Sequence, residues 1–254
     1  MKITFLGTGT SQGIPIIGSD HPVCLSDNPK DKRLRVSVLV EWDNNAYVVD
    51  CGPDFRQQML RSKCKRIDGI IFTHEHSDHV AGMDDIRPFF FRQGAIPIYA
   101  HKRVIKALKR RFDYFFIDEE NKYPGVPSLK INQVKKKLFS LNGLEVTPIK
   151  VDHNKWPVFG YRFKDFAYLT DVKTVAKEER EKLKNLKVLV VNALRLTPHP
   201  SHFNLEEALK FIEDIKPEKT YLTHISHHLG FHDEVQQQLP QNVYLAYDNL
   251  QITI

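Results

Sequence analysis

The feature that most constrains this chain is the segment Thr73–His79, which reads THEHSDH. Within six residues it places the imidazoles of His74, His76 and His79 and the carboxylate of Asp78. An apolar run precedes the segment and a small-residue turn follows it, so we expect a buried strand before it and a helix start after it. In an extended backbone the first two histidines point to one side, while the aspartate and the last histidine aim at a neighbouring point. A solvated His-rich loop lacks this strand–loop–helix context, so the segment predicts ligands for two adjacent metal ions.

Three further strand-like runs each stop at a residue that can bind a metal. IKVD is followed by His153, AYLT by Asp171 and TYLT by His224. Functional groups gather at the carboxyl ends of strands in open sheets. We therefore expect seven side chains to converge: His74, His76, Asp78, His79, His153, Asp171 and His224. Seven nitrogen and carboxylate ligands suit two ions, and a carboxylate can bridge them.

The chain resembles hydrolases of the metallo-β-lactamase fold, in the branch of dinuclear phosphodiesterases. The resemblance covers most of the chain and includes the opening FLGTGT of Phe5–Thr10 and the VDCG of Val49–Gly52. It continues through the HxHxDH segment and then His153, Asp171 and His224 in that order. Within this branch the chain is most similar to phosphoribosyl 1,2-cyclic phosphate phosphodiesterases. The tRNA 3′-processing endonucleases are more distant relatives.

The expected fold class is α/β. Each half of the chain has several strands followed by helices, which predicts two packed sheets covered by helices. The resemblance implies a four-layer αββα sandwich with the metals along one edge of the sheets. The 254 residues contain no linker or shift in composition, so we expect a single hydrolase domain over residues 1–254.

The resemblance also implies roles for the ligands. His74, His76 and His153 would hold the first ion, Asp78, His79 and His224 the second, and Asp171 would bridge them. The nucleophile would be a hydroxide between the metals, which excludes Cys51 as the nucleophile. Two divalent ions are expected, either Zn or Mn, with Fe and Ni also compatible with these ligands.

Carboxylates commonly hold ligand imidazoles in the correct tautomer. Asp50 is the first candidate for this role, because it ends the strand-like run Tyr47–Val49, and Asp248 is the second. Either could instead be a simple turn residue.

A leaving alkoxide needs a proton. The segment PHPSH precedes a helix whose expected N-cap is Asn204, and helix N-termini favour anions. The resemblance matches His202 to a histidine that is not a ligand and that assists phosphodiester cleavage. His199 is the alternative, and a purely structural role for His202 also stays open.

The loop SDHPVC departs from the related phosphodiesterases, which carry a CxCxxC loop and a structural zinc. Here Ser19 and His21 replace two cysteines, leaving His21, Cys24 and His227 as usable ligands. Losing two thiolates removes the strongest zinc ligands. We therefore expect this vestigial site to be empty or only partly occupied.

Composition and charge limit the possible substrates, partners and cellular compartment. The net charge is +6, from 37 basic and 31 acidic residues, which attracts a small anionic phosphodiester but is too small to indicate nucleic acid by itself. Three cysteines without disulfide-like spacing and no leader or membrane-spanning pattern predict a cytoplasmic protein without a membrane partner. Alternatives left open are an RNA 3′-processing endonuclease, a non-catalytic metal-binding protein and a homodimer.

The sequence also makes three predictions about local structure. Residues 78–92 are expected to form one helix with a kink or break at Pro88, and its Phe89–Phe91 cluster to pack in the core or line the cleft. Residues 118–134 are low in periodicity and are expected to be an insertion or lid over one edge. Residues 174–186 are expected to be one helix.

Overall fold

The computed structural model describes residues 1–254, apart from the side chain of Glu119. Two seven-stranded mixed sheets form its centre. The first sheet has the strand order β14 (Gln251–Thr253), β1 (Lys2–Gly7), β2 (Ser37–Trp42), β3 (Asn45–Val49), β4 (Gly69–Ile71), β5 (Ile96–His101), β6 (Leu129–Val134). The second sheet has the order β13 (Val243–Leu245), β12 (Lys219–Thr223), β11 (Val188–Asn192), β10 (Phe166–Tyr168), β9 (Trp156–Phe163), β8 (Leu144–His153), β7 (Phe139–Leu141).

The two sheets repeat one pairing pattern. In the first sheet β14, β1, β2 and β3 pair antiparallel, and β3 to β6 pair parallel. In the second sheet β7 to β10 pair antiparallel, and β10 to β13 pair parallel. Parallel strands need crossover connections, and the helices supply several of them. The parallel halves therefore bring their carboxyl ends to one edge of the molecule.

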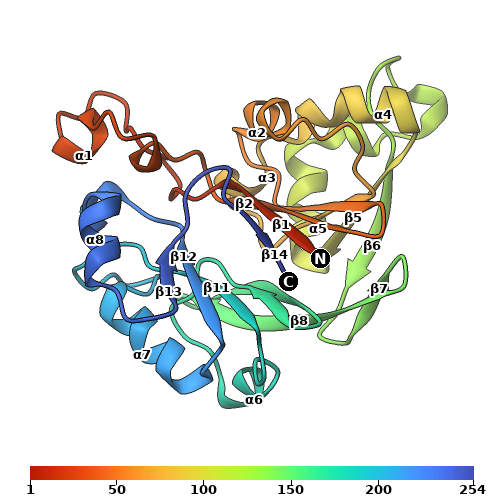
Figure 1. Cartoon of the computed structure of the whole chain (residues 1–254). Coiled ribbons are helices and arrows are strands. Elements are labelled where there is room, and N and C mark those ends of the chain that lie inside the picture. Colours follow the sequence, from red (N-terminus) through yellow and green to blue (C-terminus); the bar gives the residue numbers. More distant parts are fainter.

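Helices cover the outer face of each sheet (Figure 1). The helices are α1 (Pro22–Leu25), α2 (Phe55–Ser62), α3 (Ser77–Val80), α4 (Arg87–Gln93), α5 (Lys102–Arg111), α6 (Lys177–Glu181), α7 (Leu205–Ile215) and α8 (His232–Gln238). The apolar faces of α2, α4 and α5 pack on the first sheet, and those of α7 and α8 pack on the second. None of the helices in the described chain is both long and apolar enough to cross a membrane.

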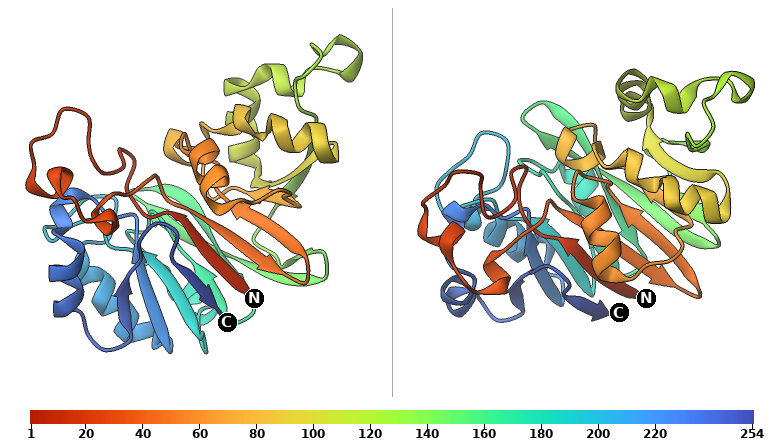
Figure 2. Two further views of the ribbon diagram at one scale, coloured as in Figure 1. Left: turned by 45° about the horizontal axis from the view of Figure 1, so that its top comes forward. Right: turned by 90° about the horizontal axis from the view of Figure 1, so that it is seen from above.

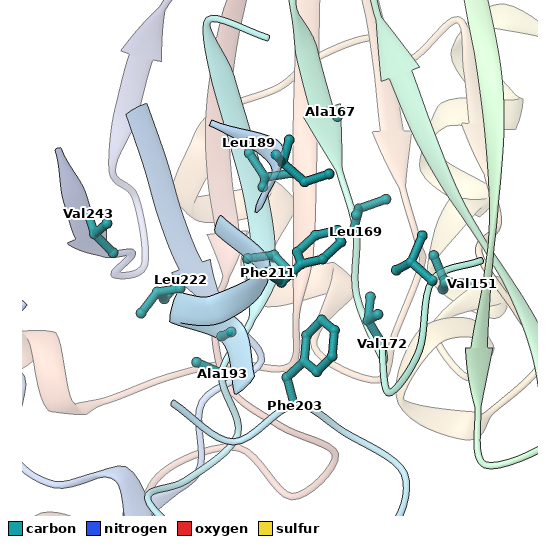
Figure 3. Packing of buried hydrophobic residues seen from close by; sticks show 14 of the residues in the cluster. Val151, Ala167, Leu169, Val172, Leu189, Ala193, Phe203, Phe211, Leu222 and Val243 are labelled. Atoms are coloured by element: carbon teal, nitrogen blue, oxygen red, sulfur yellow. The ribbon is translucent and has the colours of Figure 1, made fainter. Parts of the chain in front are cut away.

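Three apolar layers separate these four layers of secondary structure. One lies between the sheets, where Phe5 and Tyr47 of the first sheet share a buried cluster with Tyr161 and Phe166 of the second. Another lies between the second sheet and its helices, where Phe203 and Phe211 pack with their ring centroids 5.4 Å apart (Figure 3). The third lies under α2, α4 and α5. The predicted α/β class and the four-layer αββα sandwich are confirmed; that residues 1–254 form one domain stays a prediction.

The expected single helix over residues 78–92 is wrong. The segment divides into α3, the 3₁₀ turn η2 (Met83–Ile86) and α4. The break is at Gly82 and not at Pro88, which sits in the first turn of α4 where proline is tolerated. A side chain on Gly82 would collide with the carbonyl oxygen of Gly52, so only glycine allows the chain to pass this close to the segment that follows β3.

Residues 118–134 also differ from the prediction. They include η4 (Glu119–Asn121) and then β6, which pairs parallel with β5 along its full length and forms the edge of the first sheet. The segment LKINQV shows no clear strand pattern, because this edge strand buries only Val134 and carries several polar side chains. The Phe89–Phe91 cluster is divided: Phe89 lies in the core, Phe90 packs at its margin and Phe91 is exposed.

The helix expected over residues 174–186 is shorter than predicted. Within this range only α6 is helical. Thr174 forms a β-bridge with Asp152 near the end of β8, which keeps the residues just before α6 out of the helix. The helix that begins after Asn204 is confirmed. Its capping box is complete, with Asn204 and Glu207 exchanging two hydrogen bonds of 3.0 Å.

The loop that carries α1 lies beside α8 (Figure 2). Its anchor is Arg33, which is 3% exposed and contacts Nδ1 of His232 at 3.0 Å. The same guanidinium donates to the hydroxyl of Thr8 and to the carbonyl oxygen of Ala246. Buried Asp31 accepts a hydrogen bond from the backbone N–H of His232 at 2.7 Å. The loop is thereby tied to the segments that flank β1, β12 and β13.

Candidate metal centre

The carboxyl ends of four strands deliver the predicted ligands to one place. His153 is the last residue of β8, and His224 directly follows β12. Asp171 and His74 each follow a strand, β10 and β4, by three residues. Asp171 and His224 adopt the left-handed backbone conformation, with φ of 56° and 53°. Such a φ is uncommon outside glycine, although Asp and His tolerate it better than most residues, and it turns each side chain sharply out of its strand.

Asp171 lies at the middle of the cluster and is 2% exposed. Its Oδ2 atom is 3.3 Å from Nε2 of His79, and its Oδ1 atom is 3.3 Å from Nε2 of His224. Nε2 of His202 lies 3.0 Å from the same Oδ1 atom. Asp78 approaches from the HxHxDH segment, with Oδ2 at 3.2 Å from Nε2 of His79. Asp171 also shares groups of close ligand atoms with His74 and with His153, so this one carboxylate lies between the two predicted ligand sets.

The remaining histidines complete the cluster on the other side of Asp171. Nε2 of His74 and Nδ1 of His76 are 2.9 Å apart, and the ring of His153 lies 5.3 Å from that of His76. Three groups have ligand atoms within 4.8 Å of one another: His74–His79–Asp171, Asp78–His79–His224 and His153–Asp171–His202. The structure thus brings all seven predicted ligands together, and it adds His202 to their surroundings.

Fixed acceptors orient three of the imidazoles. Nδ1 of His79 donates to Asp50 at 2.7 Å, and Nδ1 of His153 donates to the carbonyl oxygen of Ser201 at 2.8 Å. The hydroxyl of Thr73 donates to Asp50 at 2.8 Å and lies 3.0 Å from Nδ1 of His74. With Nδ1 engaged in this way, each ring directs Nε2 toward the cluster, where Nε2 of His74 lies within hydrogen-bonding distance of Nδ1 of His76.

The outcome for the two predicted supporting carboxylates differs. Asp50 contacts the imidazole of His79, a predicted ligand, as expected. Asp248 does not: it accepts hydrogen bonds from the hydroxyl of Thr8, the backbone N–H of Leu34 and the guanidinium of Arg61. Asp248 holds the N-terminal loop against α2, so its predicted role beside the histidines is wrong.

Electrostatics in the cluster favour a cation. Burial acts to lower the pKa of His79, but the negative charges of Asp78 and Asp171 outweigh burial and raise that pKa well above its usual value. Burial acts to raise the pKa of Asp171, yet the nearby imidazoles of His224 and His79 hold it well below its usual range. Burial lowers the pKa of His74, which keeps this ring neutral. Without a metal ion, His79 therefore holds a proton between two ionised carboxylates, and a divalent cation can replace that proton as the positive charge between them.

Buried ring nitrogens give an independent test of the fit to metal ions. Among the described residues, no group hydrogen-bonds Nε2 of His79 or either ring nitrogen of His224. A buried nitrogen without a partner is unfavourable by about 1–3 kcal/mol, so such groups are rare in folded proteins. Metal coordination would satisfy Nε2 of His79 and one nitrogen of His224. The donor set therefore fits divalent ions.

The histidines before α7 occupy different positions. His202 is 8% exposed and touches Asp171, whereas His199 lies behind it, with the two Nδ1 atoms 3.1 Å apart. Burial lowers the pKa of both rings. Of the two candidates for proton transfer, only His202 faces the cluster directly.

The vestigial loop site is less complete. The rings of His21 and His227 are 4.7 Å apart, and His228, which the sequence analysis did not single out, lies 3.8 Å from His227. Nδ1 of His21 accepts from the backbone N–H of Val23, so that nitrogen serves as a helix cap. The Cys24 side chain is 3% exposed and packs among Ile14 and other apolar residues. No described group of three close ligand atoms includes these residues.

Three residues around the centre went unnoticed in the sequence. Thr73 links Asp50 to His74, and the carbonyl oxygen of Ser201 orients His153. Trp156, at the start of β9, borders the ring of His76 at 6.0 Å. A threonine directly before the first ligand is a signal that could have been used, but a backbone carbonyl carries no signal in the sequence.

Cys51 is fully buried in the core beneath the centre, and burial raises the pKa of its thiol well above the usual value. A buried, protonated thiol is a poor nucleophile. The expectation that Cys51 plays no nucleophilic role agrees with these observations.

Comparison with known proteins places the centre in context. A crystal structure described as a new diphosphatase from the PhnP family has a TM-score of 0.93 and 38% sequence identity, over 100% of this chain and 97% of that one. A protein named octanoyltransferase from Porphyromonas gingivalis is 38% identical over 100% of this chain and 52% of its own length. Ribonuclease Z from Methanococcus maripaludis is 28% identical over 74% of this chain and 58% of its own.

This chain therefore spans little more than half the length of these two curated relatives. The family model described as the beta-lactamase superfamily domain matches residues 45–225, which include all seven candidate ligands of the centre. Together with the two sheets and the clustered His and Asp side chains, this match shows that the chain is a member of the β-lactamase superfamily with the metallo-β-lactamase fold.

Proposed function

We propose that this protein is a dinuclear metal-dependent hydrolase of small phosphoric diesters, including diphosphate diesters. The observation that carries the proposal is the convergence of seven candidate ligands, with Asp171 at their middle and three of the imidazoles oriented through Nδ1. His74, His76 and His153 would hold one ion, and Asp78, His79 and His224 the other. Asp171 would contribute one oxygen to each.

The two ions, when bound, would polarise the phosphoryl oxygens and lower the pKa of a water molecule. The protein's own contribution is to fix the ligands. Asp50 and Thr73 hold His79 and His74 in a single orientation, so that no reorganisation is needed during the reaction. The buried carboxylates stay ionised because neighbouring imidazoles keep the pKa of Asp171 low.

His202 is proposed as the residue that protonates the leaving oxygen. Its Nε2 atom faces the centre beside Asp171, and its Nδ1 atom contacts the hydroxyl of Ser201 at 3.1 Å. Asp171 supports a proton on Nε2, while burial makes that proton easier to release. A positioned group of this kind typically contributes 10²–10⁴-fold to the rate, on the order of the effect expected here.

The choice of a small substrate rests on the similarities. The protein with a TM-score of 0.93 is described as a diphosphatase and matches this chain from end to end. The ribonuclease Z relative, by contrast, is matched over only 58% of its length. RNA 3′ processing is therefore the second candidate function.

Acyl transfer is disfavoured for this chain. The octanoyltransferase relative is about twice as long as this chain, so its activity concerns a larger protein. Burial raises the pKa of the thiols of Cys51 and Cys64, and Cys24 is enclosed by apolar side chains. None of these positions resembles an activated thiol.

The deciding experiment compares three substrates. Purified protein, stripped with chelator and reloaded with Mn²⁺ or Zn²⁺, is assayed on bis(p-nitrophenyl) phosphate, on a dinucleoside diphosphate and on a precursor tRNA. Metal-dependent hydrolysis of either small substrate, absent in Asp171→Asn, supports the proposal. Cleavage of the tRNA alone would favour the nuclease, and metal binding without turnover of any substrate would indicate a non-catalytic protein.

A further inference from the structure

Trp156 occupies an unusual position for a large apolar side chain. It follows the turn Asn154–Lys155 at the tip of the β8–β9 hairpin and is 50% exposed. Its ring lies 6.0 Å from that of His76, a candidate ligand, at an angle of 53°. Single exposed apolar residues need no explanation in general, but this one stands at the rim of the proposed reaction site.

A fixed guanidinium backs the Trp156 ring. Cζ of Arg103 lies 4.0 Å from the ring centroid, within the range of a cation–π contact. Nε of Arg103 donates to Oε1 of Glu75 at 2.6 Å, and a second guanidinium nitrogen lies 2.5 Å from that oxygen. The indole is thus supported on one side while half of its surface stays open.

Glu75 makes this support rigid. It lies between His74 and His76 in sequence and is only 8% exposed. Its backbone carbonyl oxygen accepts a hydrogen bond from Arg111 at 2.6 Å, so α5 holds both ends of this residue. The segment that carries the ligands therefore also fixes the platform beside them.

From this arrangement we propose that Trp156 stacks against an aromatic ring of the substrate, which makes the preferred substrate a phosphoric diester that carries a nucleobase. The inference rests on the proposed function, because it places the phosphate at the metal centre. The charge of Arg103 is already neutralised by Glu75, so the available surface is the indole and not a phosphate-binding cation. A sugar separates base from phosphate in a nucleotide, which suits a platform at the rim and not at the centre.

Stacking can be tested without turnover. The chain has two tryptophans, and Trp42, stacked on Tyr47 at the far end of β2, can be replaced by phenylalanine. In Trp42→Phe the fluorescence then comes from Trp156 alone. Titration with AMP should quench this emission in a saturable manner, whereas ribose 5-phosphate should not. Equal responses to both ligands, or no response to AMP, would overturn the proposal.

Kinetics supply the second test. The metal-loaded protein is assayed on 2′,3′-cyclic AMP and on glycerol 1,2-cyclic phosphate, two five-membered cyclic diesters that differ in the presence of a base. Trp156→Leu should raise KM for the first by about 10- to 100-fold, the range typical of lost base stacking, and leave KM for the second within about twofold. Trp156→Phe should retain most of the preference.

Two controls test whether the effect of Trp156→Leu is specific to base stacking. Tyr123→Ala removes an aromatic that is 79% exposed and lies outside the cluster, and it should change neither KM. Unchanged thermal unfolding of Trp156→Leu shows that the hairpin still folds. If both diesters are hydrolysed and Trp156→Leu weakens them equally, stacking is refuted while the proposed function stands. If AMP still quenches but neither diester is hydrolysed, the proposed function fails and the binding platform survives.

Discussion

Oδ2 of Asp50 accepts a hydrogen bond from Nδ1 of His79 at 2.7 Å, and both side chains are completely buried. Oδ1 of the same carboxylate accepts from the backbone N–H of Thr73 at 2.8 Å, just before the first ligand. Burial raises the pKa of Asp50, an effect that the neighbouring imidazole of His79 opposes. One carboxylate thus holds both ends of the HxHxDH segment.

Replacing Asp50 with asparagine should weaken metal binding. The amide keeps the size of the side chain but removes the charge that supports His79, so we expect about a 10- to 100-fold loss in metal affinity or activity. Competition titration with a chromogenic chelator measures the affinity. Asp248→Asn is the matched control, because it removes a buried carboxylate that touches no imidazole. A similar loss of affinity in both variants would contradict the specific role of Asp50.

Asp171→Asn should lose most activity together with at least one bound ion. Asp171 lies close to ligand atoms of both proposed sets, His74 and His153 for the first ion and His79 and His224 for the second. It is the one carboxylate proposed for the first ion, so an amide leaves that ion without an anionic ligand. Elemental analysis of the purified variant gives the ion count. Asp152→Asn, which alters a half-exposed carboxylate on β8, should change neither quantity. Two ions and full turnover in Asp171→Asn would refute the bridge.

His202→Ala should keep both ions and slow the cleavage of alkyl diesters by about 10²- to 10⁴-fold. The loss should be smaller for an aryl ester, because an aryloxide leaves with little need for a proton. Rates for matched alkyl and aryl substrates measure the difference. Loss of an ion would show instead that His202 is a ligand, in line with its position beside His153 and Asp171. Equal losses for both substrates would indicate that it positions the substrate.

The loop site should contribute no third tightly bound ion. Cys24 is packed among apolar side chains and Nδ1 of His21 is engaged as a helix cap, which leaves few free ligands there. We expect about two ions per chain, as a dinuclear centre requires, and the same count in Cys24→Ala. A third ion that disappears in this variant would show that His21, Cys24 and His227 still bind metal.

Acidification should destabilise the contact between the N-terminal loop and α8. Burial and the charge of Arg33 lower the pKa of His232 from 6.5 to about 4. The unfolded chain therefore binds a proton at a higher pH than the folded one, so this contribution to stability is present above about pH 6.5 and is lost as the pH falls through about 4.

Urea unfolding between pH 4 and pH 7 tests this expectation. The free energy of unfolding of the wild type should fall more steeply with acidification than that of His232→Gln, which cannot gain the proton. Other buried histidines titrate in both proteins, so the difference between the two curves is the informative quantity. Parallel curves would show that His232 is not the group responsible.

The sequence alone predicted the fold class and the group of candidate ligands that lie together in the structure. Period-two apolar runs that each stop at His or Asp, together with the HxHxDH spacing, predicted that His153, Asp171 and His224 would meet His74 and His79. The physical reason is that parallel strands carry their carboxyl ends to a common edge. The capped helix after Asn204 followed in the same way from a local signal, since both partners of its capping box lie within four residues.

Only the tertiary structure decided how these residues are held. Gly82 follows α3 and packs against Gly52, which lies 30 residues earlier in the sequence. β6 forms a strand because it pairs with the edge of β5. The left-handed φ of Asp50, Asp171 and His224 is unfavourable locally and persists because the surrounding contacts over-determine it. Trp156 likewise gained its place beside His76 through a hairpin and a helix that are distant in sequence. Contacts of this kind depend on which segments meet in space, and no local pattern of residues encodes that.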